Sequence, residues 1–199
     1  EIAAAPNVVA GVGAILIDRL SQPGGLSGIV TTAQTTNLPT SALTRYTDGV
    51  GVMIGLEIYT AVGISATTAT ASYTNQAGTS GRTTKAVAFG GIGISTAGNI
   101  IIMPLQDGDT GVKSVESVTL AGTTATAGNF GVTLFKPLAS FPALFTPMKD
   151  NLGYYANSLV GNGGGLIQIL SDACLSLLIT GTGNPSGVVN GYLKIVETA

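Results

Sequence analysis

The sequence predicts an all-β protein: an antiparallel, jelly-roll-like sandwich of about eight strands with an extended N-terminal arm. Two observations favour this class. Threonine, valine, isoleucine and glycine dominate the chain, and short apolar runs recur between clusters of Gly, Asn, Asp and Pro. Sustained helical periodicity is hard to find, and strands at this spacing favour a sandwich over alternating β and α units.

The first part of the chain differs from the rest and predicts an arm with loops over residues 1–45. Three prolines and the pair Gly24-Gly25 interrupt it, so it does not look like a compact unit. Its longest apolar run, "VVAGVGAILI" (Val8–Ile17), suits a segment that reaches onto a neighbouring subunit. The sandwich domain is then expected over residues 46–199.

The first strand of the predicted domain lies within "GVGVMIGLEIYTAVG" (Gly49–Gly63). Alternation along it places four apolar side chains on one face: Val52, Ile54, Leu56 and Ile58. The next segment, residues 68–89, has a polar centre and predicts a β-hairpin, with Gly78 and Gly81 supplying positive φ at its tip.

Further strands follow at short intervals. Asn99–Leu105 predicts a strand that Pro104 ends or places at a sheet edge. Residues 111–122 and 128–139 then predict a pair of strands joined by "GTTATAG".

Two late strands are expected at Ala173–Thr180 and Val188–Glu197. Helix is expected to be minor, with Ser41–Tyr46 and Pro142–Leu159 as its candidates, although Pro147 and Gly153 interrupt the second.

Composition bounds the function. Charged residues make up 9 % of the chain, against about 25 % in an ordinary soluble domain, and the net charge is −2. The mean hydropathy is +0.47. The apolar run that ends at Ile17 is half of what a membrane span needs and is closed by Asp18 and Arg19. We therefore expect no membrane span, and instead a subunit of an assembly, because interface cores are depleted in charge.

Signatures of catalysis and cofactor binding are missing from the sequence. The chain has no histidine, and it contains no nucleophile elbow and no complete phosphate loop. The lysines and arginines are scattered, so nucleic-acid binding is not expected. The single Cys174 has apolar neighbours and is expected to be a buried small side chain in a protein that folds in a reducing cytoplasm. We expect no enzyme activity and no cofactor.

Asp107-Gly108-Asp109 has two interpretations, a calcium loop or a tight turn. An EF-hand loop starting at Asp107 would need an oxygen ligand at its fifth position and a glutamate at its twelfth. Those positions hold Gly111 and Val118, so the calcium pattern fails. The sequence predicts a turn, in which Asp109 bonds the backbone beyond it.

The segment after that turn resembles a part of the structural proteins of tailed bacteriophages. Leu105–Pro142 reads "LQDGDTGVKSVESVTLAGTTATAGNFGVTLFKPLASFP", with a Gly-Asp-Thr-Gly-Val turn, a Ser-Val-x-Ser-Val-Thr-Leu strand and a Lys-Pro-Leu-Ala ending. Asp18–Thr60 and Ser72–Thr84 are similar in character, so the resemblance covers roughly residues 18–142.

This resemblance implies a virion protein, most like a capsid decoration or cement protein. Such a subunit would bind the outer surface of the capsid, bridge neighbouring major capsid proteins and stabilise the shell against the pressure of packaged DNA. Its expected partners are the major capsid protein and two further copies of itself in a homotrimer. The alternatives are a head fibre, a tail protein, a minor or major capsid protein, or a carbohydrate-binding jelly roll using Tyr154-Tyr155.

Two segments are the candidates for the interface with capsid or neighbouring subunits, the apolar arm and the hairpin tip. Arginine makes paired hydrogen bonds to carboxylates, so Arg82 is either an anchor for a partner or a solvated turn residue. The candidate interface residues are Val8, Val9, Val12, Ile15, Ile17, Asn75, Gln76 and Arg82.

Overall fold

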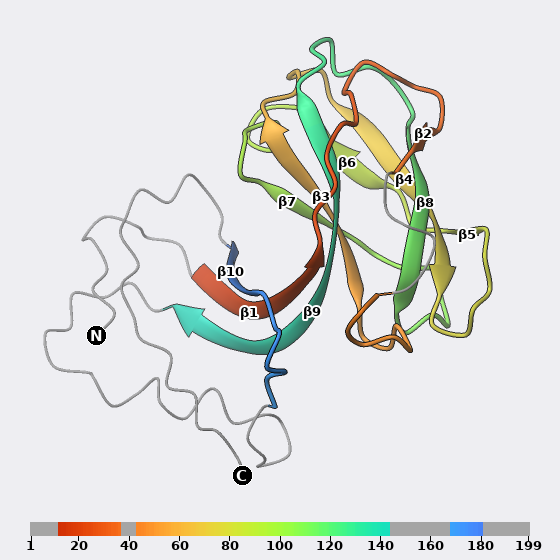
Figure 1. Cartoon of the computed structure of the whole chain (residues 1–199). Coiled ribbons are helices and arrows are strands. Elements are labelled where there is room, and N and C mark those ends of the chain that lie inside the picture. The colour runs from red at the N-terminus through yellow and green to blue at the C-terminus, as the bar shows by residue number, and fades with distance from the viewer. Residues whose placement is uncertain (1–11, 37–42, 144–167, 181–199) are drawn as a thin grey trace, which may run out of the picture. The chain divides into compact units, whose positions relative to one another are not determined.

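The structure of the chain is a computed structural model that describes residues 12–36, 43–143 and 168–180 (Figure 1). Every regular element in these ranges is a strand. Among the described residues, no helix is long and apolar enough to cross a membrane.

In the described part of the chain, ten strands form two antiparallel sheets. The first sheet has the order β10-β1-β9-β3-β7 and consists of β1 (Val12–Ser21), β3 (Met53–Thr60), β7 (Ile100–Met103), β9 (Asn129–Ala143) and β10 (Leu175–Thr180). The second has the order β2-β8-β4-β5, with β6 also paired to β4, and consists of β2 (Gln34–Thr35), β4 (Thr67–Asn75), β5 (Arg82–Thr83), β6 (Val87–Phe89) and β8 (Val112–Leu120).

The predicted all-β antiparallel sandwich is confirmed, while the jelly-roll connectivity stays a prediction. The described residues alone contain ten strands, where the sequence predicted about eight for the whole chain. Two of the ten, β2 and β5, are two-residue pairings too short to be recognised by alternation.

The chain divides into two compact units. We call the larger one the body, and it consists of Asp18–Pro137 with Asp172–Leu175. The other consists of Glu1–Ile17, Leu138–Ser171 and Ser176–Ala199. The residues predicted as an N-terminal arm contain the strands β1 and β2, and one of them, Leu26, belongs to the buried core. The predicted domain boundary at residue 45 stays a prediction.

The core lies between the two sheets of the body. The inward face predicted for this segment is confirmed, because Ile54, Leu56 and Ile58 of β3 have no exposed surface, and neither has Val52 directly before it. Phe130 of β9 packs against Phe89 of β6, with ring centroids 4.6 Å apart. The other buried core residues on β4, β8 and β9 are Ala69, Ala71, Tyr73, Val112, Val115, Val118, Leu120, Val132 and Leu134.

The strands of residues 111–122 and 128–139 do not pair, so that prediction is wrong. β8 pairs with β4 and β2, whereas β9 pairs with β3 in the other sheet. Packed sheets lie about 10 Å apart, a distance that the connection over residues 121–128 is long enough to cross. Each strand then turns its apolar side chains into the core from its own sheet.

The structure confirms two further strand predictions and contradicts the described parts of both helix predictions. β7 is an edge strand ending directly before Pro104, and β10 lies inside the strand predicted at Ala173–Thr180, as expected. No helix forms in the described part of Ser41–Tyr46, where Tyr46 has a φ of 50°. Residues 142–143 end β9, so the helix predicted to start there is wrong at its first residues; residues 144–159 and the strand at 188–197 lie outside the described residues.

Cys174 is exposed, and the prediction that it is buried is wrong. It comes directly before β10, where its N–H donates to Asp18 Oδ1 over 2.9 Å and its C=O accepts the Arg19 N–H over 2.9 Å. The peptide groups are thus held in place while the thiol stays in contact with solvent.

Candidate functional site

The β4–β5 hairpin contains three of the predicted interface residues, and the structure confirms the hairpin. Tyr73 pairs with Arg82 across the strands. In the turn, Gly78 and Gly81 have φ values of 84° and 71°, in the left-handed region that glycine adopts freely. Asn75 closes the turn, because its N–H donates to the Thr79 carbonyl over 3.0 Å.

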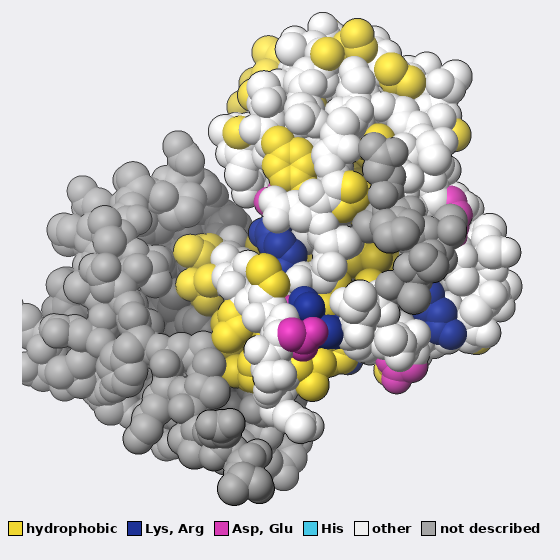
Figure 2. All heavy atoms as spheres, viewed as in Figure 1, with side chains coloured by type: hydrophobic (Ala, Val, Ile, Leu, Met, Phe, Trp, Pro, Cys, Tyr) yellow, Lys and Arg dark blue, Asp and Glu magenta, His cyan; other side chains and the backbone are white. Residues whose placement is uncertain are grey.

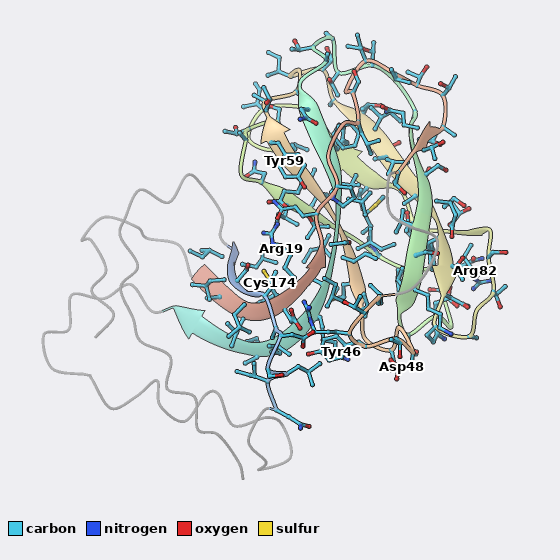
Figure 3. The ribbon with its side chains drawn as sticks, in the orientation of Figure 1. Arg19, Tyr46, Asp48, Tyr59, Arg82 and Cys174 are labelled. Atoms are coloured by element: carbon cyan, nitrogen blue, oxygen red, sulfur yellow. The ribbon has the colours of Figure 1, made fainter. Side chains whose placement is uncertain are left out.

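Asp109, in the β7–β8 loop, is the centre of the polar contacts at this hairpin. Its carboxylate accepts hydrogen bonds from Arg82 Nε over 2.9 Å, from Asn75 Nδ2 over 2.7 Å and from the Tyr73 hydroxyl. The Tyr73 oxygen in turn accepts the N–H of Gln106 over 2.9 Å. Three side chains of the hairpin strands therefore hold one loop carboxylate, and Figure 3 shows Arg82 at this edge of the body.

Gln76 also connects the hairpin to the β7–β8 loop, through hydrogen bonds with backbone groups of that loop. Its Oε1 accepts the N–H groups of Thr110 and Gly111 over 3.1 and 3.2 Å. Its own N–H donates to the Gly111 carbonyl over 3.1 Å. The hairpin tip is thus tied to the β7–β8 loop at two neighbouring points.

The electrostatics of the site favour an ionised Asp109. Hydrogen bonds from Arg82 and Tyr73 lower the pKa of Asp109 from 3.8 to about 2, against the opposing effect of burial. Burial raises the pKa of Tyr73, and its hydrogen bond to Asp109 raises it further. The Arg82–Asp109 pair has side-chain exposures of 27 % and 4 %, so water has little access to the carboxylate.

This arrangement is suited to holding a loop in place. A general base needs a pKa near the working pH, whereas Asp109 is ionised well below neutrality and already accepts three hydrogen bonds. The neighbouring Asp107 makes an exposed ion pair of 2.6 Å with Lys85. Among the described residues, no group of three or more His, Cys, Asp or Glu side chains could hold a metal ion.

The predicted turn at Asp107-Gly108-Asp109 is confirmed. Gly108 has a φ of 88°, and the Asp109 N–H donates to the Gln106 carbonyl over 3.0 Å. The Asp109 side chain, however, bonds the hairpin side chains and not the backbone beyond it as predicted, because β4 pairs with β8 and brings Asn75 opposite Val112.

An open depression of the surface, with a volume of about 440 Å³, lies beside this turn. Its lining consists of Gly51–Met53 and Met103–Thr110, so the start of β3 and the end of β7 form its apolar part while Asp107 and Asp109 belong to its polar part.

Two further ion pairs lie on the first sheet of the body. Arg45 donates to both oxygens of Asp18 over 2.9 and 2.8 Å, and the Asp18 side chain has no exposed surface. This hydrogen bonding raises the pKa of Arg45. Arg19 pairs with Glu57, which also accepts the Thr133 hydroxyl. These pairs join β1, β3, β9 and the segment after residue 43.

The structure places the predicted interface residues in two groups. Asn75, Gln76 and Arg82 come together beside Asp109, as described above. Three others are on β1, where Val12 is the first residue, Ile15 is half-buried and Ile17 is 1 % exposed. Val8 and Val9 lie outside the described residues.

The sequence interpretation missed Asp109 as the partner of the hairpin. Alternation over residues 69–75 carried a usable signal, because it turns Tyr73 toward the core. A buried tyrosine hydroxyl normally finds a hydrogen-bond partner. The identity of that partner follows only from the pairing of β4 with β8.

In comparisons with protein-family models, with curated proteins and with solved structures, the chain has no match.

Proposed function

We propose that the chain is a structural component of a tailed-bacteriophage virion. It binds the outer surface of the capsid, bridges neighbouring major capsid proteins and stabilises the shell against internal DNA pressure. In this role it is a decoration protein with no enzymatic activity and no cofactor, made in the host cytoplasm and located on the virion.

The observation that carries this proposal is the scarcity of charge. Charged residues make up 9 % of the chain, and nine of the thirteen in its described part form ion pairs within the chain. A surface with so little uncompensated charge loses little solvation energy when a partner covers it. A low content of unpaired charge therefore suits a protein whose surface is largely covered by other subunits.

The extent of the resemblance to phage virion proteins supports the same proposal. The resemblance covers residues 18–142, and the larger part of the body is Asp18–Pro137. The three similar segments therefore lie almost wholly within one compact unit that has its own core, as expected if the resemblance reflects a shared fold.

Such a protein works through contact area. A standard protein interface buries about 1,600 Å² in total, and several such contacts around a homotrimer would connect several capsid subunits. Attachment through loops is favoured when those loops are already held in one arrangement. The hydrogen bonds around Asp109 connect the β4–β5 hairpin to the β7–β8 loop in this way.

Co-sedimentation tests the proposal. Purified chain is mixed with expanded shells of the virus that encodes it, assembled without this protein, and pelleted over a range of concentrations. We expect saturable binding, with copies per shell at a simple ratio to the major capsid protein, and a raised temperature of shell rupture. The heat-unfolded chain and a small β-sandwich of unrelated origin serve as controls.

The proposal fails if the folded chain stays in the supernatant at saturating shell concentrations. Binding to purified tails or to glycans in place of shells would also overturn it, and would assign the chain to one of the alternative roles. Sedimentation equilibrium of the free chain separately tests the homotrimer.

A further inference from the structure

The strand β10 lies at the edge of the first sheet, next to β1, and its side chains are poorly buried. Over residues 168–179 every side chain is exposed or half-buried, and Leu177 and Ile179 are each 43 % exposed. Inner strands of the same sheet differ, since Ile54 of β3 and Val132 of β9 have no exposed surface. Segments with few buried apolar contacts open at a lower free energy than the core does.

Polar groups attach the start of this strand to the body. The Cys174 N–H donates to Asp18 Oδ1 over 2.9 Å, and the Cys174 C=O accepts the Arg19 N–H over 2.9 Å. Asp172 is 64 % exposed and has Oδ2 3.6 Å from a guanidinium nitrogen of Arg45. Figure 2 shows acidic and basic side chains side by side in the middle of the face in view. When the segment detaches, water replaces the partners of these groups.

The place that receives this segment is formed by other residues of the body. Arg45 donates to both oxygens of Asp18 over 2.9 and 2.8 Å, and it also donates to the Arg19 carbonyl over 3.0 Å. These bonds orient the carboxylate that accepts the Cys174 N–H, and none of them involves residues 168–180. The acceptor is therefore pre-organised, so a strand that binds there has a smaller ordering cost.

The connection to this segment is long. Residues 144–167 lie between the end of β9 at Ala143 and the described residues that start at Gln168. A chain of that length spans at most about 80 Å when extended. A compact unit of the size of the body is about 35 Å across. The connection is therefore long enough for the segment of one copy to reach β1 of a neighbouring copy.

We propose that residues 172–180 are an exchangeable strand, which pairs with β1 of its own chain or takes the same place beside β1 of a second copy. Two copies then hold each other by reciprocal β10–β1 pairing. Because the copies are identical, the bonds of Cys174 with Asp18 and Arg19, and the contact of Asp172 with Arg45, form between the chains as they do within one. The inference does not depend on a role in the virion.

A disulfide across this contact records which chain supplies the strand. Arg19→Cys places a thiol opposite Cys174, the single native cysteine, and Glu57→Gln removes the carboxylate charge that would lose its Arg19 partner. Equal amounts of light and nitrogen-15-labelled double variant are unfolded together, refolded, checked by circular dichroism and oxidised. Mass spectrometry then counts the disulfide-linked 19–174 peptides that contain one light and one heavy half.

We expect these mixed peptides to increase with the protein concentration. A segment on a flexible connection has an effective concentration of roughly 1 mM, so refolding at about 1 mM should give at least about a tenth of mixed peptides, and refolding at about 10 µM less than about a fiftieth. The collision control combines Arg19→Ser and Glu57→Gln with Thr126→Cys, at an exposed loop residue. Single-isotope peptides alone at both concentrations would overturn the exchange, and so would as many mixed 126–174 peptides in the control.

Hydrogen exchange of the wild-type chain tests the same inference without any substitution. We expect the amides of Arg19 and Cys174, which bond across this contact, to exchange at least about 100-fold faster than those of Ile54 and Val132 in the inner strands. Equal protection at all four amides would show that β10 detaches only when the whole body unfolds, and the inference would be wrong.

Discussion

Replacing Thr124 by valine removes one buried hydroxyl without changing the shape of the side chain. The wild-type hydroxyl accepts the Gly63 N–H over 3.1 Å and donates to the carbonyl of Gly28 or of Thr126, over 3.0 and 2.9 Å. After Thr124→Val the Gly63 N–H has lost this acceptor inside the protein. The variant therefore isolates the side-chain hydrogen bonds by which Thr124 connects the loops over residues 27–33, 61–66 and 121–128.

The magnitude follows from the burial of these groups. An orphaned buried N–H costs about 1–3 kcal/mol, and the lost donation contributes about 1 kcal/mol more. We expect the free energy of unfolding to fall by about 2–4 kcal/mol. At about 2–4 °C per kcal/mol for a chain of this size, Tm falls by on the order of 10 °C.

Thermal and urea unfolding monitored by circular dichroism measure this effect. Thr126→Val, at an exposed threonine two residues further on, is the matched control and should change the stability by less than about 0.5 kcal/mol. Thr124→Ser retains the hydroxyl and should lie closer to the wild type than Thr124→Val does. The reasoning is refuted if Thr124→Val unfolds at the same temperature as Thr126→Val.

Three other properties are testable on the free protein. The pKa of Asp109 is lowered from 3.8 to about 2 in the folded chain, so its contribution to stability is complete above about pH 4 and is lost as the pH falls to about 2. Between these pH values the Tm of the wild type should therefore decline more steeply than the Tm of Asp109→Asn. Parallel curves of Tm against pH would contradict this. Arg45→Met leaves the fully buried Asp18 carboxylate without its partner and should cost about 3–5 kcal/mol in urea unfolding. The exposed pair of Lys85 provides the control, since Lys85→Met should cost less than about 1 kcal/mol. Cys174 is exposed, so a thiol reagent should modify one group per native chain at the rate seen in urea, and a slow reaction would show that the thiol is covered.

The sequence predicted well where each residue is constrained by its own strand. Alternation placed Ile54 and Leu56 in the core, and two glycines located the hairpin turn correctly. These features depend on the period of two along a strand and on the φ values that glycine tolerates. Neither needs knowledge of any distant residue.

Predictions about distant partners were less successful. β8 and β9 follow each other along the chain and look like a hairpin, yet each pairs in a different sheet. Cys174 has apolar neighbours in sequence, but the bonds of its peptide group with Asp18 and Arg19 leave the thiol outside. In both cases the local pattern is compatible with two arrangements, and contacts from elsewhere in the chain choose between them.

The sequence by itself thus determined the all-β class, the low charge and the inward face of β3, because composition and strand period are local properties. Only the tertiary structure decided which groups come together. Asp109 joins Tyr73, Asn75 and Arg82 through strand pairing across more than twenty residues of chain, and Thr124 gathers loops that start almost a hundred residues apart. Such long-range contacts leave no fixed spacing in the sequence, because the entropy of closing a loop changes only slowly with its length.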